Sequence, residues 1–528
     1  NLSSYHGFSL AGGDLDGRFW VSWHNQRVAR VQSDVTLKHL GLLQNNKQVI
    51  FQPFLAFHGV WDRLTSGFSL KVDQVQLKPH DSLRPHASIG LLYKNSEVKH
   101  FLVVGSQLNM GVFSQLAQDY QGLPVSLREW LSHVRPKGLI KKISLSFMLN
   151  HNQVLLDSAE ASFSDGVMRA YKSTPGVEGL RGHVIYRPDA FDIFLNSYHG
   201  MLNIKQIFHH PLNFDQLKTQ IFYRKNQEMT QWYVPSMQVQ LPSIKWRMTA
   251  SSYQGVHDPS PIVDCLADFE VNDVSKVAPL IPDYHLSDGL QKWLKQAFIS
   301  GSLGSGAMVF RGPINDFPFN DHRGIFEVKG IVRDLTLNYD KSWPNIQHLS
   351  GEMLFKNQSL HVVANHVSVN GMTAENATAS IKNLHHADLV VDVSGVGDLS
   401  QGLGFLKSTS LSIGQKLLPL EAKGPMNLKL HLNLPIKNHM NGSQVKGKLE
   451  TGDGQLTIPE WALMFTHLNG VLHFNNNGIW SKQLQGRFLN HSIHCSVKTN
   501  KNSFNQSKTS IQMNGYASIL SLKKIVPM

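Results

Sequence analysis

Histidine and cysteine, the usual protein ligands of zinc, come together in the segment HSIHC, which contains His491, His494 and Cys495. Successive side chains of a β-strand point to opposite faces, so His491 and Cys495 would share one face and His494 would lie on the other. Ligands divided in this way are poorly placed to surround one ion. The pairs His209-His210 and His385-His386 are expected by chance among 27 histidines. The sequence therefore predicts no metal site and no cofactor.

The sequence motifs of common enzyme classes are also missing. The chain contains no nucleophile elbow, P-loop, dinucleotide fingerprint or HExxH helix. Asp14 and Asp16, in GGDLDG, resemble turn residues, and no two carboxylates are identifiable as an acid–base pair. We therefore predict a protein that is not an enzyme and has no catalytic residues. A hydrolase on a β scaffold is the alternative that the sequence favours least.

Apolar and polar residues alternate through most of the chain. In NLKLHLNLPIK, residues 427–437, leucine or isoleucine occupies every second position from Leu428 to Ile436. The segments KISLSFMLN (142–150), SMQVQL (236–241) and DLTLNY (334–339) alternate in the same way. A period of two indicates strands with one apolar and one polar face. Helical periodicity is rare by comparison.

Short turn signals separate these candidate strands. Asn370-Gly371, Asp453-Gly454 and the run from Asn475 to Gly478 fit hairpins between consecutive antiparallel strands. The sequence thus predicts a mainly β fold, built as a long, curved antiparallel meander with a few short amphipathic helices.

Two segments repeat a helical pattern. LREWLSHVRPKG (127–138) and LQKWLKQAFISG (290–301) both place tryptophan three residues after leucine and glycine eight residues after tryptophan. Their apolar residues have helical spacing, so each predicts a short amphipathic helix capped by glycine. We expect these helices to plug a core or the flank of a groove through Trp130, Leu131, Trp293 and Leu294.

A second repeat consists of Leu-x-Gly followed by an alternating segment. It occurs in GLRGHVIYRPDAFDIFL, HLSGEMLFKNQSLHVV and HLNGVLHFNNNGIWSK, and each copy predicts a hairpin. The repeated tryptophans are 293 − 130 = 163 residues apart, and the leucines of the first two Leu-x-Gly copies are 349 − 180 = 169 residues apart. The similar intervals indicate a duplicated module. We predict a first β segment over residues 1–121 and two helix-plus-strands units over 122–285 and 286–528, all in one continuous, elongated structure.

Composition limits the remaining possibilities. The chain has 528 residues, 41% of them hydrophobic, and a net charge of +12, which favours anionic surfaces such as membranes. The positive charges are scattered and no nucleic-acid-binding signature occurs, so nucleic acid is not expected as a partner. The chain starts without methionine or a signal peptide, has no apolar run of membrane-spanning length, and has only two cysteines. We expect it to be an internal fragment of a longer protein.

A single layer of amphipathic strands must cover its apolar face. A sandwich, a closed barrel, a β-helix and an open groove filled by a ligand would each do so. A membrane barrel would place aromatic girdles at its strand ends, whereas tryptophan here falls in the predicted helices and before the glycine hairpins. The duplicated, helix-bearing unit favours an elongated open groove.

Most of the chain resembles a known family, most strongly from about Leu286 to Leu484 and more weakly before Leu123. LSDGLQKWLKQAFISGSLGSGAMVFRGPINDFPF, then GIFEVKGIVRDLTLNYDKSWPNIQHLSGEMLF and KGPMNLKLHLNLPI, are similar to the YhdP family of AsmA-like proteins of Gram-negative bacteria. The resemblance implies a periplasmic β-groove, anchored to the inner membrane, that carries phospholipids toward the outer membrane and supports its permeability barrier. Phospholipids, the inner membrane, and the outer membrane or its proteins would be the partners. The amino-terminal membrane helix and the carboxy-terminal end of the family are missing from this chain.

If the apolar faces hold lipid, the groove is lined by the apolar residues of the best alternating segments. An envelope protein that is purely structural, or that binds a partner chain without conducting lipid, is the alternative. The expected lining consists of Ile143, Leu145, Phe147, Phe326, Val328, Leu335, Leu337, Leu428, Leu430, Leu432 and Leu434.

Overall fold

A computed structural model gives the fold of the chain. It describes residues 8–516, except 45–46, 77–86, 95–98, 112–113, 115–117, 119–124, 151–152, 173, 206–207, 209, 281–287, 320–322, 342, 385–387, 409–418, 436–441 and 502–506. His209, His385, His386 and Ile436 therefore lie outside the described residues. Within them, 27 strands form one antiparallel sheet, and no pairing closes this sheet on itself. The mainly β prediction is confirmed.

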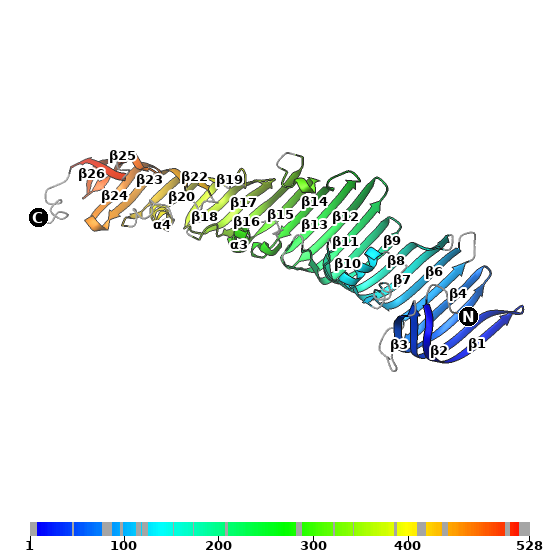
Figure 1. Cartoon of the computed structure of the whole chain (residues 1–528). Coiled ribbons are helices and arrows are strands. Elements are labelled where there is room, and N and C mark those ends of the chain that lie inside the picture. Colours follow the sequence, from blue (N-terminus) through cyan, green and yellow to red (C-terminus); the bar gives the residue numbers. More distant parts are fainter. Residues whose placement is uncertain are drawn as a thin grey trace. The chain divides into compact units, whose positions relative to one another are not determined.

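The chain divides into two compact units, Asn1–Pro242 with Arg247–Pro261 and Ser243–Trp246 with Ile262–Met528. We call these the first and second unit and describe each by itself. In both units, consecutive strands lie side by side as antiparallel neighbours (Figure 1). The predicted boundaries at residues 121 and 285 stay predictions.

The first unit consists of long strands and one short helix. Its elements are β1 (Phe8–His24), β2 (Arg27–Gln44), β3 (Lys47–Leu64), β4 (Gly67–Gln76), β5 (Ala87–Lys94), β6 (Lys99–Asn109), α2 (Val125–Val134), β7 (Lys137–Asn150), β8 (Gln153–Met168), β9 (Gly176–Arg187), β10 (Ala190–Asn203), β11 (Leu212–Lys225), β12 (Met229–Leu241) and β13 (Ile244–Gly255).

The second unit continues the same pattern with two further α-helices and short 3₁₀ turns. Its elements are β14 (Ile262–Val271), η1 (Val274–Lys276), η2 (Ala278–Leu280), α3 (Asp288–Ala297), β15 (Phe298–Pro313), η3 (Ile314–Asp316), β16 (Ile325–Leu337), β17 (Ile346–Lys356), β18 (Ser359–Val369), β19 (Met372–Ile381), β20 (Asp388–Asp398), α4 (Leu399–Ser408), β21 (Glu421–Lys423), β22 (Pro425–Pro435), β23 (Gln444–Ile458), η5 (Pro459–Trp461), β24 (Leu463–Asn475), β25 (Gly478–Phe488), β26 (His491–Lys501) and β27 (Ser507–Gly515).

Two of the three predicted turns are confirmed. Asn370 and Gly371 connect β18 to β19 and both have positive φ, as a two-residue type I′ hairpin requires. The run from Asn475 to Gly478 connects β24 to β25. The third prediction is wrong, because Asp453-Gly454 lies inside β23, at an irregularity in its pairing with β24. A bulge and a turn both favour Asp-Gly, so composition alone did not separate them.

Both predicted helices are present, but the glycines do not cap them. Helix α2 ends at Val134 and Arg135 takes the left-handed conformation after it, with its backbone N–H donating to Leu131 O at 3.0 Å. Gly138 and Gly301 belong to the strands that follow the helices and have φ of 131° and 119°. A Cβ on Gly301 would lie 2.7 Å from Leu335 Cα. The glycines therefore allow two backbones to approach each other at a bulge.

The glycine of the Leu-x-Gly repeat also allows two backbones to approach closely. All three copies form hairpins, β9–β10, β17–β18 and β24–β25, as predicted. A Cβ on Gly182, Gly351 or Gly470 would lie 2.4, 2.1 or 2.7 Å from a carbonyl oxygen of the neighbouring strand. Because these contacts are too short for any side chain, only glycine fits at the repeated position.

Left-handed residues recur along one edge of the first unit. From β2 to β10, every second strand contains one near its C-terminal end, and these residues are His39, Gln74, Gln107, Asp165 and His199. Alternate strands of an antiparallel sheet run in the same direction, so the five residues lie toward the same edge. Bulges bend a strand and increase its twist. Their alignment bends the sheet of this unit along one line.

We predict that Gly301→Ala destabilises the second unit by more than about 1 kcal/mol, because alanine is strained at positive φ and its Cβ meets the backbone of β16. Thermal unfolding followed by circular dichroism measures the change. Gly452→Ala is the control, since its Cβ would meet nothing within 4 Å. Equal melting temperatures for the two variants would contradict the explanation that both repeats need glycine eight residues after tryptophan because two backbones approach closely there.

Candidate functional site

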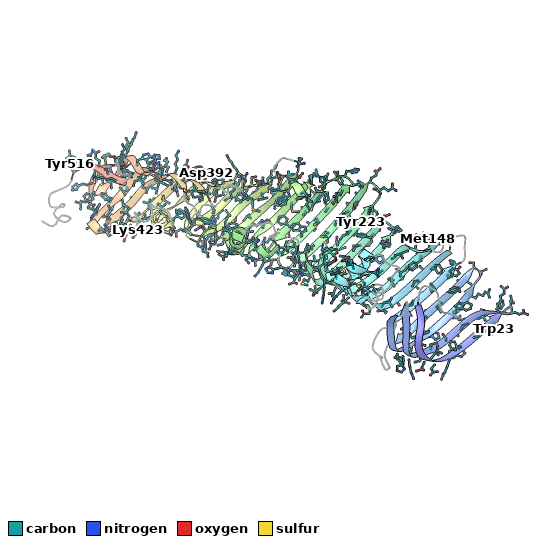
Figure 2. All side chains as sticks on the ribbon, in the orientation of Figure 1. Trp23, Met148, Tyr223, Asp392, Lys423 and Tyr516 are labelled. Atoms are coloured by element: carbon teal, nitrogen blue, oxygen red, sulfur yellow. The ribbon has the colours of Figure 1, made fainter. Side chains whose placement is uncertain are left out.

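The most extensive feature of the first unit is a row of apolar side chains that crosses twelve consecutive strands on one face. Residues that are directly opposite in an antiparallel pair point to the same face, so the printed register defines the row. Tyr223, which is labelled in Figure 2, belongs to it. The row consists of Val21, Val31, Trp61, Leu70, Leu91, Val103, Leu145, Ala159, Tyr186, Phe191, Tyr223 and Trp232.

This row contains no charged side chain, and the backbone N–H and C=O groups of its strands lie in the plane of the sheet. Its side chains are nevertheless not enclosed in a core. Leu70, Tyr186 and Trp232 are 36%, 41% and 41% exposed. In an ordinary core, apolar side chains at the centre of a sheet are buried by a second layer. In the first unit, one layer of sheet leaves the row accessible to a ligand.

The second unit has equivalent rows on one face. One row of nine residues crosses β16 to β25, and another of eight residues crosses β14 to β22. The first consists of Val332, Gly351, Ala364, Ala377, Val393, Leu430, Gly447, Phe474 and Ile479. The second consists of Ala267, Met308, Val328, Phe355, Leu360, Ile381, Leu389 and Leu434.

The structure thus brings the predicted lining residues onto continuous apolar faces. In the first unit, Ile143, Leu145 and Phe147 face Gly105, Val103 and Phe101 of β6. In the second, all eight predicted residues lie on the face of these rows, on β16 and β22. Phe326 joins an aromatic cluster with Phe310, Phe317 and Phe355, with ring centroids 5.4–6.2 Å from it. Contact of these residues with lipid stays a prediction.

The opposite face of the sheet carries charged side chains, several of which pair across strands. His58 contacts Asp34 at 2.7 Å, and His431 contacts Asp392, labelled in Figure 2, at the same distance. Exposed pairs of this kind contribute little stability individually. They show that this face is solvated, so the apolar rows lie on the other one.

Asp192 is a buried charged residue on this polar face. Arg187 and Arg224, on the strands to either side, contact its two oxygens at 3.1 and 2.5 Å. Burial alone would raise the pKa of Asp192, but the hydrogen bonds from Arg224 and Arg187 outweigh it and hold the pKa below its ordinary value. The bridge connects β9, β10 and β11 from the polar side.

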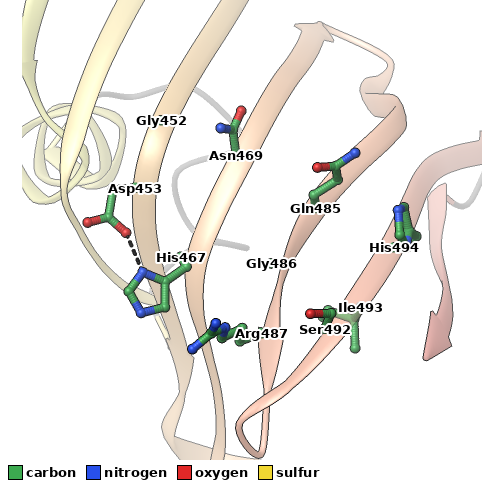
Figure 3. A pocket seen from close by; sticks show the side chains of 10 residues that line it. All are labelled: Gly452, Asp453, His467, Asn469, Gln485, Gly486, Arg487, Ser492, Ile493 and His494. Carbon is green, nitrogen blue, oxygen red and sulfur yellow. Dashed lines mark hydrogen bonds and ion pairs between the residues drawn. The ribbon is translucent and has the colours of Figure 1, made fainter. Parts of the chain in front are cut away.

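A shallow pocket of about 510 Å³ opens on the polar face of the second unit (Figure 3). His467 and Asp453, joined at 2.9 Å, lie beside Arg487, Gln485 and Asn469 in its lining. Leu484 pairs with Cys495, and both point to the apolar face. Gln485 follows Leu484 in the strand and therefore points to the opposite face, as do the pocket residues paired with it. The pocket is therefore separate from the apolar face.

Few of the described side chains are placed to bind a metal ion or to act as nucleophiles. Within the described residues, no three histidine, cysteine or acidic side chains are grouped to bind a metal ion. Cys265 and Cys495 are free and buried, and burial raises the pKa of both thiols, which makes them poor nucleophiles. Among the helices in the described part of the chain, none is both long and apolar enough to cross a membrane.

The two predicted plug helices have matching hydrogen bonds. Trp130 Nε1 donates to Thr174 Oγ1, and Trp293 Nε1 donates to the backbone oxygen of Tyr339, both at 3.0 Å. Leu131 and Leu294 are half-buried on the same helices. Each tryptophan thus fixes its helix to a connection beside the sheet. A plugging role in the groove stays a prediction.

Sequence reasoning missed α4 and the role of Trp343. Trp343, in the β16–β17 connection, packs in one buried cluster with Leu432 and Leu434 of β22, and Phe405 of α4 packs against this cluster. The available signal for α4 was Asp398 as a helix cap followed by leucines at helical spacing. Gly402 and Gly404 weaken that signal, because glycine disfavours helix.

The contact between Trp343 and β22 shows that the sheet of the second unit is curved. Strand β22 is four pairings from β17, and Ile346, the first residue of β17, is level with the start of β22, near Asn427. On a flat sheet, Ile346 and Leu432 would be about 25 Å apart. Trp343 is three residues from Ile346, so its Cα lies within about 10 Å of Ile346 Cα and its indole ring extends roughly 6 Å further. This reach falls short of the distance on a flat sheet, and curvature of the sheet closes the difference, so that the apolar face is the inside of a trough.

We predict that Leu434→Ala costs about 2–4 kcal/mol locally, because Leu434 is 2% exposed beneath this cluster. Leu428→Ala, at a half-buried position of the same strand, should cost less than half as much. Hydrogen exchange of β22 and β23 amides measures both. Similar protection in the two variants would mean that Trp343 and Phe405 do not cover this end of the strand.

Comparisons with known proteins identify the family of this chain. The family model described as YhdP protein matches residues 1–527. The intermembrane phospholipid transporter YhdP of Escherichia coli (strain K12) is 24% identical over 390 residues, which are 73% of this chain and 30% of that protein. The chain thus spans about a third of the length of its relative. No solved structure matches it. By the match over its whole length, the chain belongs to the YhdP family.

Proposed function

We propose that this chain conducts phospholipids, with their acyl chains lying along the apolar rows and their head groups in water at the open side. The observation that carries the proposal is the twelve-strand row of the first unit, which has no charged side chain and is partly exposed. The name of the Escherichia coli relative, an intermembrane phospholipid transporter, supports phospholipid as the ligand.

The energetics of lipid transfer explain why such a row is needed. Each methylene removed from water contributes roughly 0.8 kcal/mol, so two long acyl chains exposed to water cost on the order of 20 kcal/mol. A lipid therefore does not cross an aqueous gap unaided. An apolar surface along the whole path removes most of this barrier.

Because the row is similar along its length, it favours movement of a lipid along it over retention of the lipid at one place. Neighbouring strands are about 4.8 Å apart, so the twelve-residue row offers similar apolar contacts over about 50 Å. Dispersion and hydrophobic contacts are not directional, and a lipid that slides by one strand exchanges one set for an equivalent set. A path of this kind has no deep well in which a lipid is trapped.

The family and the relative suggest the cellular setting. We infer that the complete protein acts in the periplasm of a Gram-negative bacterium and bridges the inner and outer membranes. A segment outside this chain would anchor it to the inner membrane, and its far end would meet the outer membrane or its proteins. The role is not enzymatic: the chain would contribute to outer-membrane lipid homeostasis and the permeability barrier by guiding lipid.

A pair of neighbouring valines provides the test. Val103 belongs to the twelve-strand row, and Val104 points to the polar face, where it is 38% exposed. Val103→Asp places a carboxylate in the acyl-chain path, where its desolvation costs several kcal/mol, and Val104→Asp places the same group in water. Native mass spectrometry of protein purified without detergent counts the bound phospholipids.

We expect several phospholipids on the wild-type chain and on Val104→Asp, and fewer on Val103→Asp. In cells, the complete protein with Val103→Asp should fail to support the outer-membrane barrier, and Val104→Asp should support it. A wild-type chain without lipid, or equal lipid content in the two variants, would overturn the proposal and favour a structural role.

A further inference from the structure

A cluster of three aromatic side chains narrows the trough of the second unit. Trp343 lies in the β16–β17 connection, with its ring centroid 6.1 Å from Tyr339 and 5.8 Å from Phe405 of α4. These rings pack with Leu430, Leu432 and Leu434 on the opposite wall. The twelve-strand row of the first unit is partly exposed, whereas here side chains of a connection and of α4 cover the leucines of β22.

Helix α4 is held firmly beside this cluster. At its start, Asp398 accepts hydrogen bonds from the backbone N–H of Ser400 at 2.8 Å and of Gly424 at 2.9 Å. The hydrogen bonds from Ser400 and Gly424 lower the pKa of Asp398, so the cap stays charged at neutral pH. At its end, Lys407 Nζ donates to Leu420 O at 2.7 Å. Both ends of α4 are therefore anchored.

One polar group in this narrowing has no partner. Trp343 is 5% exposed, and within the described residues its Nε1–H makes no hydrogen bond. The indoles of Trp130 and Trp293, by contrast, both donate to protein oxygens. A buried N–H without an acceptor costs about 1–3 kcal/mol, which is recovered when a ligand supplies the acceptor.

The surroundings define the chemistry of that acceptor. The cluster consists of hydrophobic side chains, and apart from the Trp343 N–H its polar atom is the Tyr339 hydroxyl. Burial, together with the charge of Asp340, raises the pKa of Tyr339, so this hydroxyl stays protonated. A phosphate would lose its hydration here at a cost of several kcal/mol. A neutral carbonyl oxygen is desolvated far more easily and accepts one hydrogen bond.

We propose that the rings of Tyr339, Trp343 and Phe405 part to admit a diacyl phospholipid and that Trp343 Nε1–H then binds its ester carbonyl, so that this cluster is a binding station in the lipid path. This inference rests on the proposed function and adds to it the part of the lipid that is recognised. The acyl chains would lie on the leucines of β22, and the head group would remain toward water.

The test compares two soluble short-chain phosphatidylglycerols, one with ester-linked and one with ether-linked chains. The ether lipid has the same apolar length but lacks the carbonyl oxygens. The wild-type chain, labelled with ¹⁵N at tryptophan and freed of lipid, is titrated with each while its indole N–H signals are followed. The spectrum of Trp343→Phe assigns the Trp343 signal by its absence, and the Trp61 and Trp232 signals report occupancy of the first-unit row.

We expect the ester lipid to shift the Trp343 signal downfield, with a half-saturation concentration about three- to tenfold lower than that of the ether lipid, as one net hydrogen bond implies. Trp61 and Trp232 should respond equally to both lipids. Trp130→Phe, which removes an indole that already has a partner, should leave this discrimination unchanged.

The outcomes separate the two proposals. If Trp61 and Trp232 respond but Trp343 does not distinguish ester from ether, lipid occupies the groove and the carbonyl station is wrong. If no indole responds to either lipid, the proposed function itself is contradicted. Both affinities are measured on the wild-type chain, and Trp343→Phe serves only to assign the Trp343 signal.

Discussion

A sheet that is one layer thick exposes a polar face and an apolar face, and water solvates only the polar face favourably. The rest of the structure depends on how the apolar face is covered. The polar face carries cross-strand pairs such as His58 with Asp34 and the bridge from Asp192 to two arginines. In the described part of the chain, the apolar face is covered by its own curvature, by the cluster of Trp343 and Phe405 in the second unit, and otherwise by whatever occupies the trough. The sequence separates the two faces by strict alternation, which keeps charge off one face over many strands.

Curvature in turn depends on backbone features that look minor in the sequence. The left-handed residues at alternate strands of the first unit bend it along one line, and glycines such as Gly351 and Gly470 let neighbouring strands approach closely at the bends. Without these bends, the second unit could not bring Leu432 to Trp343. The repeated Leu-x-Gly pattern thus records a geometric requirement of the trough.

The sequence predicted what depends on local periodicity and missed what depends on distant contacts. Alternation placed β7, β16 and β22 and identified their apolar faces, because a period of two is a property of a single strand. Asp453-Gly454 was read as a turn because a bulge uses the same residues. The cluster of Trp343 with Leu432 joins residues 432 − 343 = 89 positions apart, and it forms only because the sheet curves. No local pattern contains that information.

In the lipid path that we propose, the two kinds of site in this chain would divide two tasks, movement along the path and orientation of the lipid. Rows of aliphatic and aromatic side chains give contacts without directional bonds, so each step along them is close to neutral in free energy. A single indole N–H in an apolar narrowing adds one directional bond, worth about 1 kcal/mol. That is enough to fix the depth and orientation of a lipid as it passes, and too little to hold it, because thermal energy breaks one such bond readily.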